Sequence, residues 1–218
     1  MGLLDRLAVR RGEVELPLVT AAPVDEPLFA TKAFAKFLAT LNGQESPTVL
    51  DLGPAVGSNV MFFAERIGCK IMVEDAYSQL EQHLRLPTLE GLPAALRARC
   101  PQGEGTIDGV ICWDIIDYLD RRSAQALADQ LTRALRPGGA LLGFFGTAPS
   151  RDSQYTKYVI ADESNLKYRP YPAVRGRQAV LLNRDIIRLF PDLRVSDSFL
   201  MKNNLREILF RKPAYATR

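Results

Sequence analysis

The sequence predicts an α/β protein whose mostly parallel sheet ends in an antiparallel hairpin. The chain has 218 residues, of which 47% are hydrophobic, so it can bury one sizeable core, and we expect a single domain over residues 1–218. From residue 48 onward, strand-like and helix-like segments alternate, as they do in parallel sheets. Near the end, two strand-like segments flank Asn203-Asn204, a pair that is typical of a hairpin turn.

The beginning of the chain is expected to be irregular. Pro17, Pro23 and Pro27 interrupt a stretch with little apolar periodicity, so an irregular arm is predicted for residues 1 to about 30. The first helix is predicted over residues 31–41, where apolar residues recur at helical spacing.

The remaining elements follow from the spacing of apolar residues. The predicted strands are residues 48–52, 70–73, 109–113, 140–145, 194–201 and 206–210. The predicted helices are residues 58–67, a stretch from about residue 77, residues 123–135 and residues 183–190. The last two strands form the hairpin, which distinguishes this sheet from a plain doubly wound dinucleotide-binding sheet.

Composition excludes several classes of protein. No apolar run approaches the roughly 20 residues that span a bilayer, and the three cysteines lack metal or disulfide spacing, so we expect a cytoplasmic protein without membrane segments. With one histidine and no ligand cluster, no metal is expected. The formal net charge of +3 makes nucleic acid an unlikely partner. Basic residues predominate after residue 150, which indicates either a solvated surface or an anionic ligand.

A short loop carries the strongest functional signal. The buried strand over residues 49–52 leads into residues 53–57, where small residues let the backbone approach a ligand closely before a helix begins. The next strand ends in Glu74-Asp75, where a carboxylate can accept hydrogen bonds from two ribose hydroxyls. These features alone also suit a nicotinamide-dependent oxidoreductase.

Four motifs in order narrow the choice. They are Asp51-Leu52-Gly53-x-Ala55-x-Gly57, Glu74, Asp108-Gly109-Val110-Ile111-Cys112-Trp113-Asp114 and Leu135-Arg136-Pro137-Gly138-Gly139. This series resembles the motifs of class I S-adenosylmethionine-dependent methyltransferases over roughly residues 48–146. The resemblance implies a three-layer, Rossmann-like sandwich with a seven-stranded, mostly parallel sheet and an antiparallel last strand. It also implies S-adenosylmethionine as the cofactor.

The resemblance assigns the cofactor site position by position. Asp51 and Gly53 would lie near the methionine part, Glu74 would bind the ribose, and Trp113 and Asp114 would line the floor. The full set of expected cofactor-binding residues is Asp51, Gly53, Pro54, Ala55, Gly57, Glu74, Asp75, Trp113 and Asp114. No clear strand ending in an acidic residue lies between Glu74 and Asp108, so the adenine pocket stays unassigned.

Methyl transfer requires mainly that two reactants be aligned in a dry cleft. For a hydroxyl or ammonium acceptor a base helps, and Asp114, Asp117 and Tyr118 are the candidates. Alternatively, Asp114 or Asp117 accepts hydrogen bonds from loop amides, or Asp117 assists the cap of the following helix.

The methyl acceptor is expected to be a small molecule. Residues 167–171 and 175–177 interleave positive charge with aromatic rings, a pattern suited to an anionic or planar substrate, or to an exposed connector. Two alternatives are a non-catalytic methyltransferase-like binding domain and a nucleic-acid methyltransferase. The second lacks support, because Asp114-Ile115-Ile116-Asp117 stands where an Asn/Asp-Pro-Pro-aromatic motif would be needed.

Overall fold

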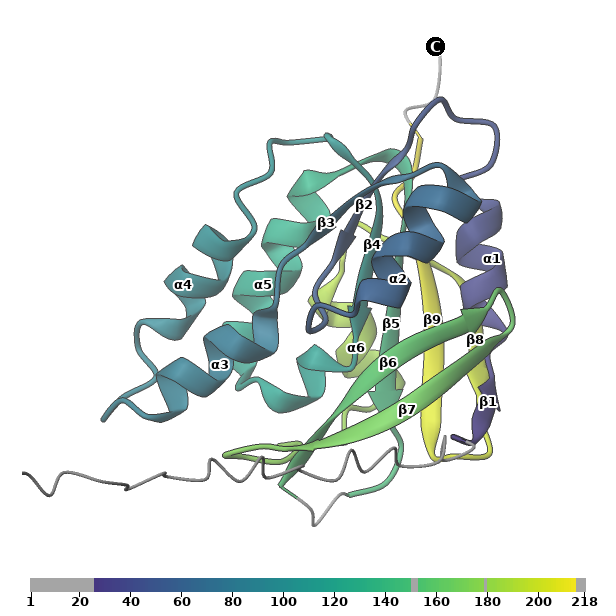
Figure 1. The fold of residues 1–218 in the computed structure, drawn as a ribbon. Helices are drawn as coiled ribbons and strands as arrows, with labels where there is room; N and C mark the ends of the chain where they lie inside the picture. The colour runs from purple at the N-terminus through teal and green to yellow at the C-terminus, as the bar shows by residue number, and fades with distance from the viewer. Residues whose placement is uncertain (1–25, 150–152, 179, 215–218) are drawn as a thin grey trace, which may run out of the picture.

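The main sheet of the computed structural model has six strands; the structure describes residues 26–149, 153–178 and 180–214. The strands are β2 (Thr48–Asp51), β3 (Lys70–Val73), β4 (Ile107–Trp113), β5 (Leu135–Gly146), β8 (Arg194–Leu200) and β9 (Leu205–Arg211). Their order is β3-β2-β4-β5-β9-β8 (Figure 1). β3, β2, β4 and β5 are mutually parallel, whereas β9 runs antiparallel to β5 and β8. The predicted closing hairpin is therefore confirmed.

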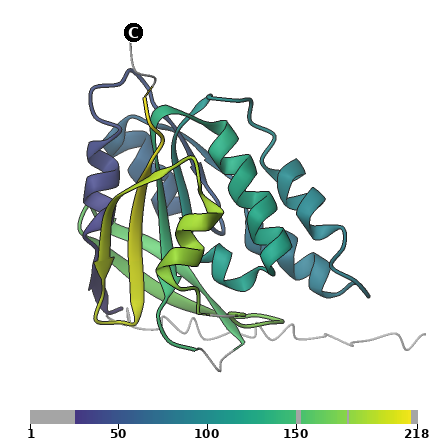
Figure 2. The same cartoon turned by 180° about the vertical axis from the view of Figure 1, so that it is seen from behind.

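Helices cover both faces of this sheet, which confirms the predicted three layers (Figures 1 and 2). One face carries α3 (Ala76–Leu84), α4 (Leu92–Arg99), α5 (Arg121–Ala134) and α6 (Asn183–Leu189). The other carries α1 (Ala33–Ala39) and α2 (Gly57–Met61), which continues as the π-helical segment η1 (Phe62–Ile67). None of the described helices combines the length and the hydrophobicity that a membrane crossing requires.

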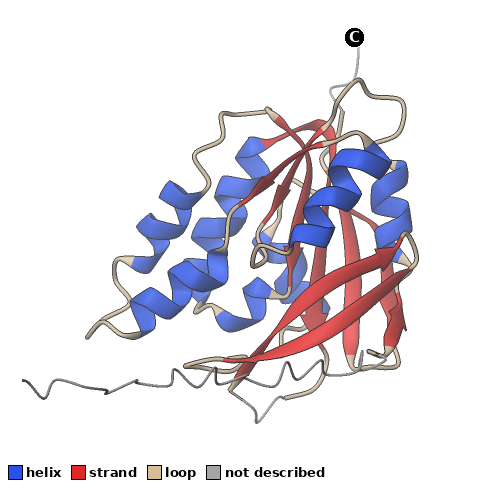
Figure 3. Cartoon of the chain, viewed as in Figure 1, coloured by secondary structure: helices blue, strands red, loops and turns tan. Residues whose placement is uncertain are grey.

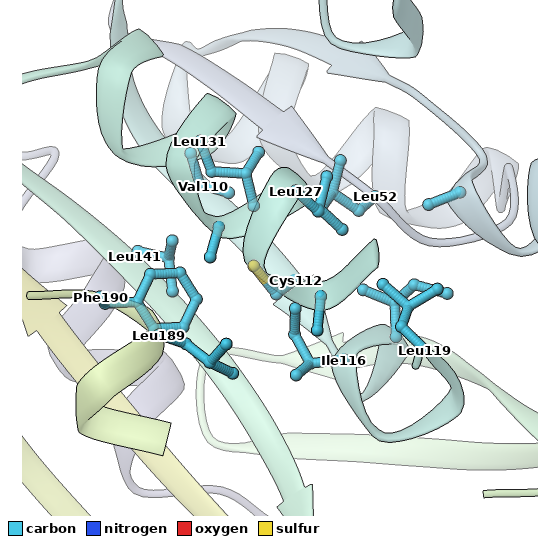
Figure 4. Packing of buried hydrophobic residues seen from close by; sticks show 14 of the residues in the cluster. Leu52, Val110, Cys112, Ile116, Leu119, Leu127, Leu131, Leu141, Leu189 and Phe190 are labelled. Atoms are coloured by element: carbon cyan, nitrogen blue, oxygen red, sulfur yellow. The ribbon is translucent and has the colours of Figure 1, made fainter. Parts of the chain in front are cut away.

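The side chains of each strand alternate between the two faces of the main sheet, and a hydrophobic core forms on each face. Successive residues of a strand point to opposite sides, so Leu50 packs with α3 to α6 whereas Val49 packs with α1 and η1. Leu141 and Leu142 divide in the same way. Figure 4 shows the first of these cores, where Leu141 lies near Phe190. The apolar run over residues 140–145 of β5 is thus explained by burial on both faces.

The expected seventh strand of the main sheet is absent from the described residues. The interval between β3 and β4 holds α3 and α4 but no strand, so β3 forms the edge of the sheet. The prediction of seven strands is wrong for this chain. The physical reason is that residues 74–106 bury their apolar side chains, such as Leu80 and Leu96, as helices against the sheet.

A second, three-stranded sheet was not predicted. It consists of β1 (Leu28–Ala30), β7 (Asn165–Pro172) and β6 (Gln154–Asp162), all paired antiparallel (Figure 3). Residues 28–30, expected to belong to the irregular arm, are therefore a strand, and residues 1–25 lie outside the described part. Residues 167–171, weighed as a possible exposed connector, lie in β7. The β6–β7 hairpin crosses the edge of the main sheet where β2 and β4 end (Figure 1).

Candidate functional site

The candidate site lies at the carboxyl ends of the parallel strands, under the β6–β7 hairpin (Figure 1). Ligands of open α/β sheets bind at this edge. The hairpin is fixed there by Asn59 of α2, whose side-chain amide donates to the carbonyl of Tyr158 and accepts from the amide of Ile160, each at 2.8 Å. Because Asn59 is buried, these two bonds are shielded from water and hold β6 over the loop of residues 53–57.

Asp51 is a buried acceptor at the end of β2. Its Oδ1 accepts hydrogen bonds from the amide of Gly53 at 2.8 Å and from the indole Nε1 of Trp113 at 2.6 Å. Burial raises the pKa of this carboxyl to about 6, although both hydrogen bonds act in the opposite direction. Asp51 therefore ties the loop to the end of β4. The expected cofactor contacts of Asp51, Gly53 and Trp113 remain predictions.

The indole of Trp113 occupies the space beside Gly53. A Cβ atom at Gly53 would lie 2.7 Å from the Cδ1 and Nε1 atoms of Trp113, closer than real Cβ contacts occur. The same indole stacks on Tyr158 of β6, with ring centroids 4.9 Å apart and an interplanar angle of 4°. Trp113 has a φ of +49°, a left-handed conformation that is rare for large side chains. The loop at Gly53 is thus closed by protein, whereas nothing lies within 4 Å of a Cβ built at Gly57.

This contrast gives a stability prediction. Gly53→Ala is expected to lower the free energy of unfolding by about 1–3 kcal/mol, because the added methyl group must displace a buried, stacked indole. Gly57→Ala has open space and should change stability by less than about 0.5 kcal/mol. Urea unfolding of both variants measures the difference. Equal stabilities for the two variants would show that the indole yields without cost.

Glu74 and Asp75 follow β3 at the neighbouring strand end. Glu74 forms an ion pair with Arg99 at 3.2 Å, and 23% of its side chain stays exposed, so a ligand can reach it. Asp75 caps α3, and its Oδ1 accepts the amide hydrogen of Ser78 at 2.9 Å. Asp75 therefore has a structural role that accounts for its position.

Pro54 and Ala55, which are neighbours in the loop of residues 53–57, differ in their exposure to solvent. Pro54 is buried, whereas Ala55 and Gly57 are exposed. Only the second half of the loop therefore faces solvent, on the same strand edge as Glu74. The expected cofactor contacts of Pro54, Ala55 and Gly57 remain predictions.

A buried polar cluster follows β4. Asp114 accepts hydrogen bonds from the hydroxyl of Tyr77 and from Nη2 of Arg177, the latter at 2.7 Å. The amide of Gly146 donates to Oδ2 of Asp117 at 2.6 Å, and Nε of Arg177 lies 3.7 Å from the same oxygen. The hydroxyl of Tyr118 donates to the carbonyl of Gln154 at 3.0 Å. The three catalytic candidates are thus brought together, with an arginine between the two carboxylates.

Burial shifts the pKa values of Asp117, Tyr77 and Tyr118 in this cluster. Desolvation raises the pKa of Asp117 to about 7, with Gly146 and Arg177 acting in the opposite direction. Burial also raises the pKa of Tyr77 and Tyr118 well above the ordinary value, so both hydroxyls stay protonated at neutral pH. A carboxyl with a pKa near neutrality suits proton transfer.

Basic residues of the segments 167–171 and 175–177 form ion pairs with acidic residues of the protein. Arg169 and Lys167 contact Glu26 at 2.5 and 3.7 Å, and Arg177 points inward to Asp114. The charges expected to attract an anionic substrate are therefore partly neutralised within the protein.

Sequence reasoning missed Tyr77, Tyr158, Asn59 and Gly146, which complete the site. The run Tyr155 to Ile160, rich in aromatic and β-branched residues, was the available signal for β6. Asn59 and Gly146 carried no signal, because their roles depend on segments 99 and 29 residues away.

No protein-family model and no curated protein match the sequence. Solved structures do match. One is 1,6-didemethyltoxoflavin-N1-methyltransferase of Burkholderia thailandensis, with 14% identity, coverage of 83% of this chain and 76% of that chain, and a TM-score of 0.52. Another is the glycopeptide N-methyltransferase MtfA, with 15% identity, coverage of 82% and 92%, and a TM-score of 0.47. A third is geranyl diphosphate C-methyltransferase of Streptomyces coelicolor A3(2), with 13% identity, coverage of 83% and 77%, and a TM-score of 0.47.

The first of these structures supports the fold assignment. The chain has the fold of class I S-adenosylmethionine-dependent methyltransferases, with six strands in its main sheet. At 14% identity the likeness concerns the fold, and function has to be argued from the site.

Proposed function

We propose that the protein is an S-adenosylmethionine-dependent methyltransferase that acts on a small molecule. The observation that carries the proposal is the strand edge itself, where the loop of residues 53–57 and the carboxylate of Glu74 lie at the ends of the neighbouring strands β2 and β3. The Burkholderia thailandensis structure of the same fold contains S-adenosylhomocysteine and a small-molecule acceptor, which supports the choice of ligand class.

The residues at this edge fit the cofactor chemically. Glu74 offers a partly exposed carboxylate for two ribose hydroxyls, and the open space at Gly57 lets the backbone approach a ligand. Near the methionine part, the proposal requires the indole of Trp113 to shift away from Gly53. Two of the buried polar atoms without a partner in the described residues, the hydroxyl of Tyr158 and Oδ1 of Asp117, would offer further bonds there.

Residues of the protein would position the two reactants and would take up the proton that the methyl acceptor loses. The bound cofactor would supply an electrophilic methyl group. Asp117, with its pKa of about 7, is the proposed base for an acceptor that must lose a proton. The β6–β7 hairpin would exclude water, because Tyr158 and Trp113 stack across the edge of the sheet.

Cofactor binding tests the proposal directly. We expect S-adenosylmethionine and S-adenosylhomocysteine, but not a nicotinamide dinucleotide, to bind the purified protein in calorimetry. Glu74→Ala should weaken this binding about 10- to 100-fold, because hydrogen bonds to a charged group each contribute about 1.5–3 kcal/mol. Arg99→Ala separates the loss of the ion pair from the loss of the ribose contact, and exposed Glu90→Ala is the surface control.

The chain offers a spectroscopic readout for the same experiment. Trp113 is the single tryptophan of the protein, so its emission should change when a ligand displaces the indole from Gly53. Calorimetric binding of neither sulfur ligand to the wild-type protein would refute the proposed function.

A non-catalytic binding domain is the second candidate. The closed position of Trp113 against Gly53 and Tyr158 favours it, because a site blocked by its own side chain need not turn over. Binding of S-adenosylmethionine without methyl loss to any tested acceptor would support this alternative.

A further inference from the structure

Two buried carboxylates next to the cofactor edge, Asp114 and Asp117, both pair with Arg177 among the described residues. The side chain of Asp114 is 0% exposed and that of Asp117 is 1% exposed, whereas Arg177 between them is 18% exposed. Arg177 is therefore the part of this group that water reaches. Buried charges require partners, so some cation has to occupy this position when both carboxylates are ionised.

The surroundings are shaped for a planar or compact cation. Gly146 leaves the necessary room, since a Cβ there would lie 2.7 Å from Nη1 of Arg177. The rings of Tyr118 and Tyr158 are buried in this part of the protein, and the hydroxyl of Tyr118 lies near the guanidinium of Arg177. Acids together with aromatic rings are the chemistry that recognises ammonium and guanidinium groups.

The cluster has unused hydrogen-bonding capacity. Oδ1 of Asp117 is buried and has no partner among the described residues, although Oδ2 accepts from Gly146. Arg177 thus leaves one acceptor unsatisfied, which costs about 1–3 kcal/mol in a buried site. A cation with more donors, or one better placed, would bind both acids more completely.

The segment that supplies Arg177 is held by few bonds. Residues 173–178 form no helix or strand. Outside the cluster, the amide of Gln178 donates to the carbonyl of Asp117 at 2.7 Å, the amide of Ala173 to the carbonyl of Ser153 at 2.8 Å, and the amide of Val174 to Glu81 at 2.9 Å. Withdrawal of the arginine would therefore break no regular element, and it would uncover the two carboxylates.

We propose that withdrawal of Arg177 opens a cation pocket, in which Asp114 and Asp117 take a positively charged amine or guanidine group of the methyl acceptor in the position that the guanidinium holds here. The inference rests on the proposed function, because it names the substrate class of that site. Arg177 acts as an internal stand-in that keeps the carboxylates paired until the acceptor arrives.

Agmatine, a small guanidine with a primary amine, is the probe for the test. Calorimetry with Arg177→Ala should show agmatine binding at least 10-fold tighter than with the wild-type protein, because the internal competitor is gone. Guanidinium chloride at millimolar concentration should raise the melting temperature of Arg177→Ala, whereas urea, its uncharged analogue, should not. Adding Asp114→Asn to Arg177→Ala should remove both effects.

The outcomes separate the two proposals. If the wild-type protein binds S-adenosylhomocysteine but folded Arg177→Ala binds agmatine no better than the wild type, the cation pocket is wrong and the proposed function stands. If Arg177→Ala does not fold, Arg177→Gln replaces it in the same comparison. If neither variant folds, saturable binding of agmatine by the wild type at saturating S-adenosylhomocysteine supports the pocket, and its absence overturns it.

Discussion

Replacing Asp114 by asparagine is expected to lower the free energy of unfolding by about 3–5 kcal/mol, the cost of removing one partner from a buried ion pair. Asparagine keeps the volume and can still accept the hydroxyl of Tyr77, so the loss isolates the charge that faces Arg177. With the carboxylate gone, Asp117 is the remaining acidic partner of the guanidinium among the residues that the structure describes, and its Oδ2 lies 3.7 Å from Nε of Arg177. Urea unfolding followed by circular dichroism measures the effect.

A double-mutant cycle decides whether the charge is the cause. Asp114→Asn combined with Arg177→Met removes both charges, and the double variant should be more stable than the sum of the two single losses by about 1–3 kcal/mol. The matched surface pair is Lys36 and Asp197, 3.0 Å apart with side chains 52% and 21% exposed. Asp197→Asn should cost no more than about 1 kcal/mol. Strict additivity in the buried cycle would contradict a direct pairing of Asp114 with Arg177.

The second large effect is a change of stability with pH. Burial raises the pKa of Asp51 to about 6 and that of Asp117 to about 7, whereas an aspartate in the unfolded chain titrates near 3.9. Between about pH 4 and pH 7 the folded protein therefore binds more protons than the unfolded chain. By linkage, these two groups lower the free energy of unfolding as pH rises, with a slope that approaches about 1.4 kcal/mol per pH unit for each.

The variant Asp117→Asn tests the direction in which the free energy of unfolding changes with pH. Because asparagine does not titrate, the stability of this variant relative to the wild type should increase from pH 5 to pH 8 by at least about 1 kcal/mol. Asp162→Asn is the opposite control, since hydrogen bonds from Ser164 and Asn165 lower the pKa of this exposed carboxyl, and the relative stability of that variant should not rise with pH. A pH-independent difference between Asp117→Asn and wild type would mean that Asp117 is not desolvated.

The elements that follow from local periodicity were predicted well. The strands β2, β3 and β4 and the helix α5 lie where the apolar pattern placed them, because their core-facing residues are close in sequence. The small sheet was missed because β1 and β7 pair across more than 130 residues, with Leu28 opposite Lys167. The short strand β1 has a weak pattern of its own, so this pairing partner defines it as a strand.

The residues of the candidate site also fall into two groups: those that a local sequence pattern indicates and those that only distant contacts bring to the site. Sequence motifs identified Asp51, Gly53, Trp113 and Asp114, since each sits at the end of a strand that its own pattern marks. They did not indicate that Arg177 would turn inward. A side chain from an irregular segment has no periodicity, and its direction is set by the buried carboxylates it meets.

The sequence by itself determined the layered sheet, the loop after β2 and the resemblance to one methyltransferase class, because these depend on contiguous residues with a fixed period. Only the tertiary structure decided the number of strands in the main sheet, the closure of Gly53 by Trp113 and the pairing of Asp114 with Arg177. The closure of Gly53 and the pairing of Asp114 depend on segments 60 or more residues apart, and the strand count depends on how residues 74–106 pack against the sheet. Free energy from packing and desolvation, which no local pattern encodes, selects among these arrangements.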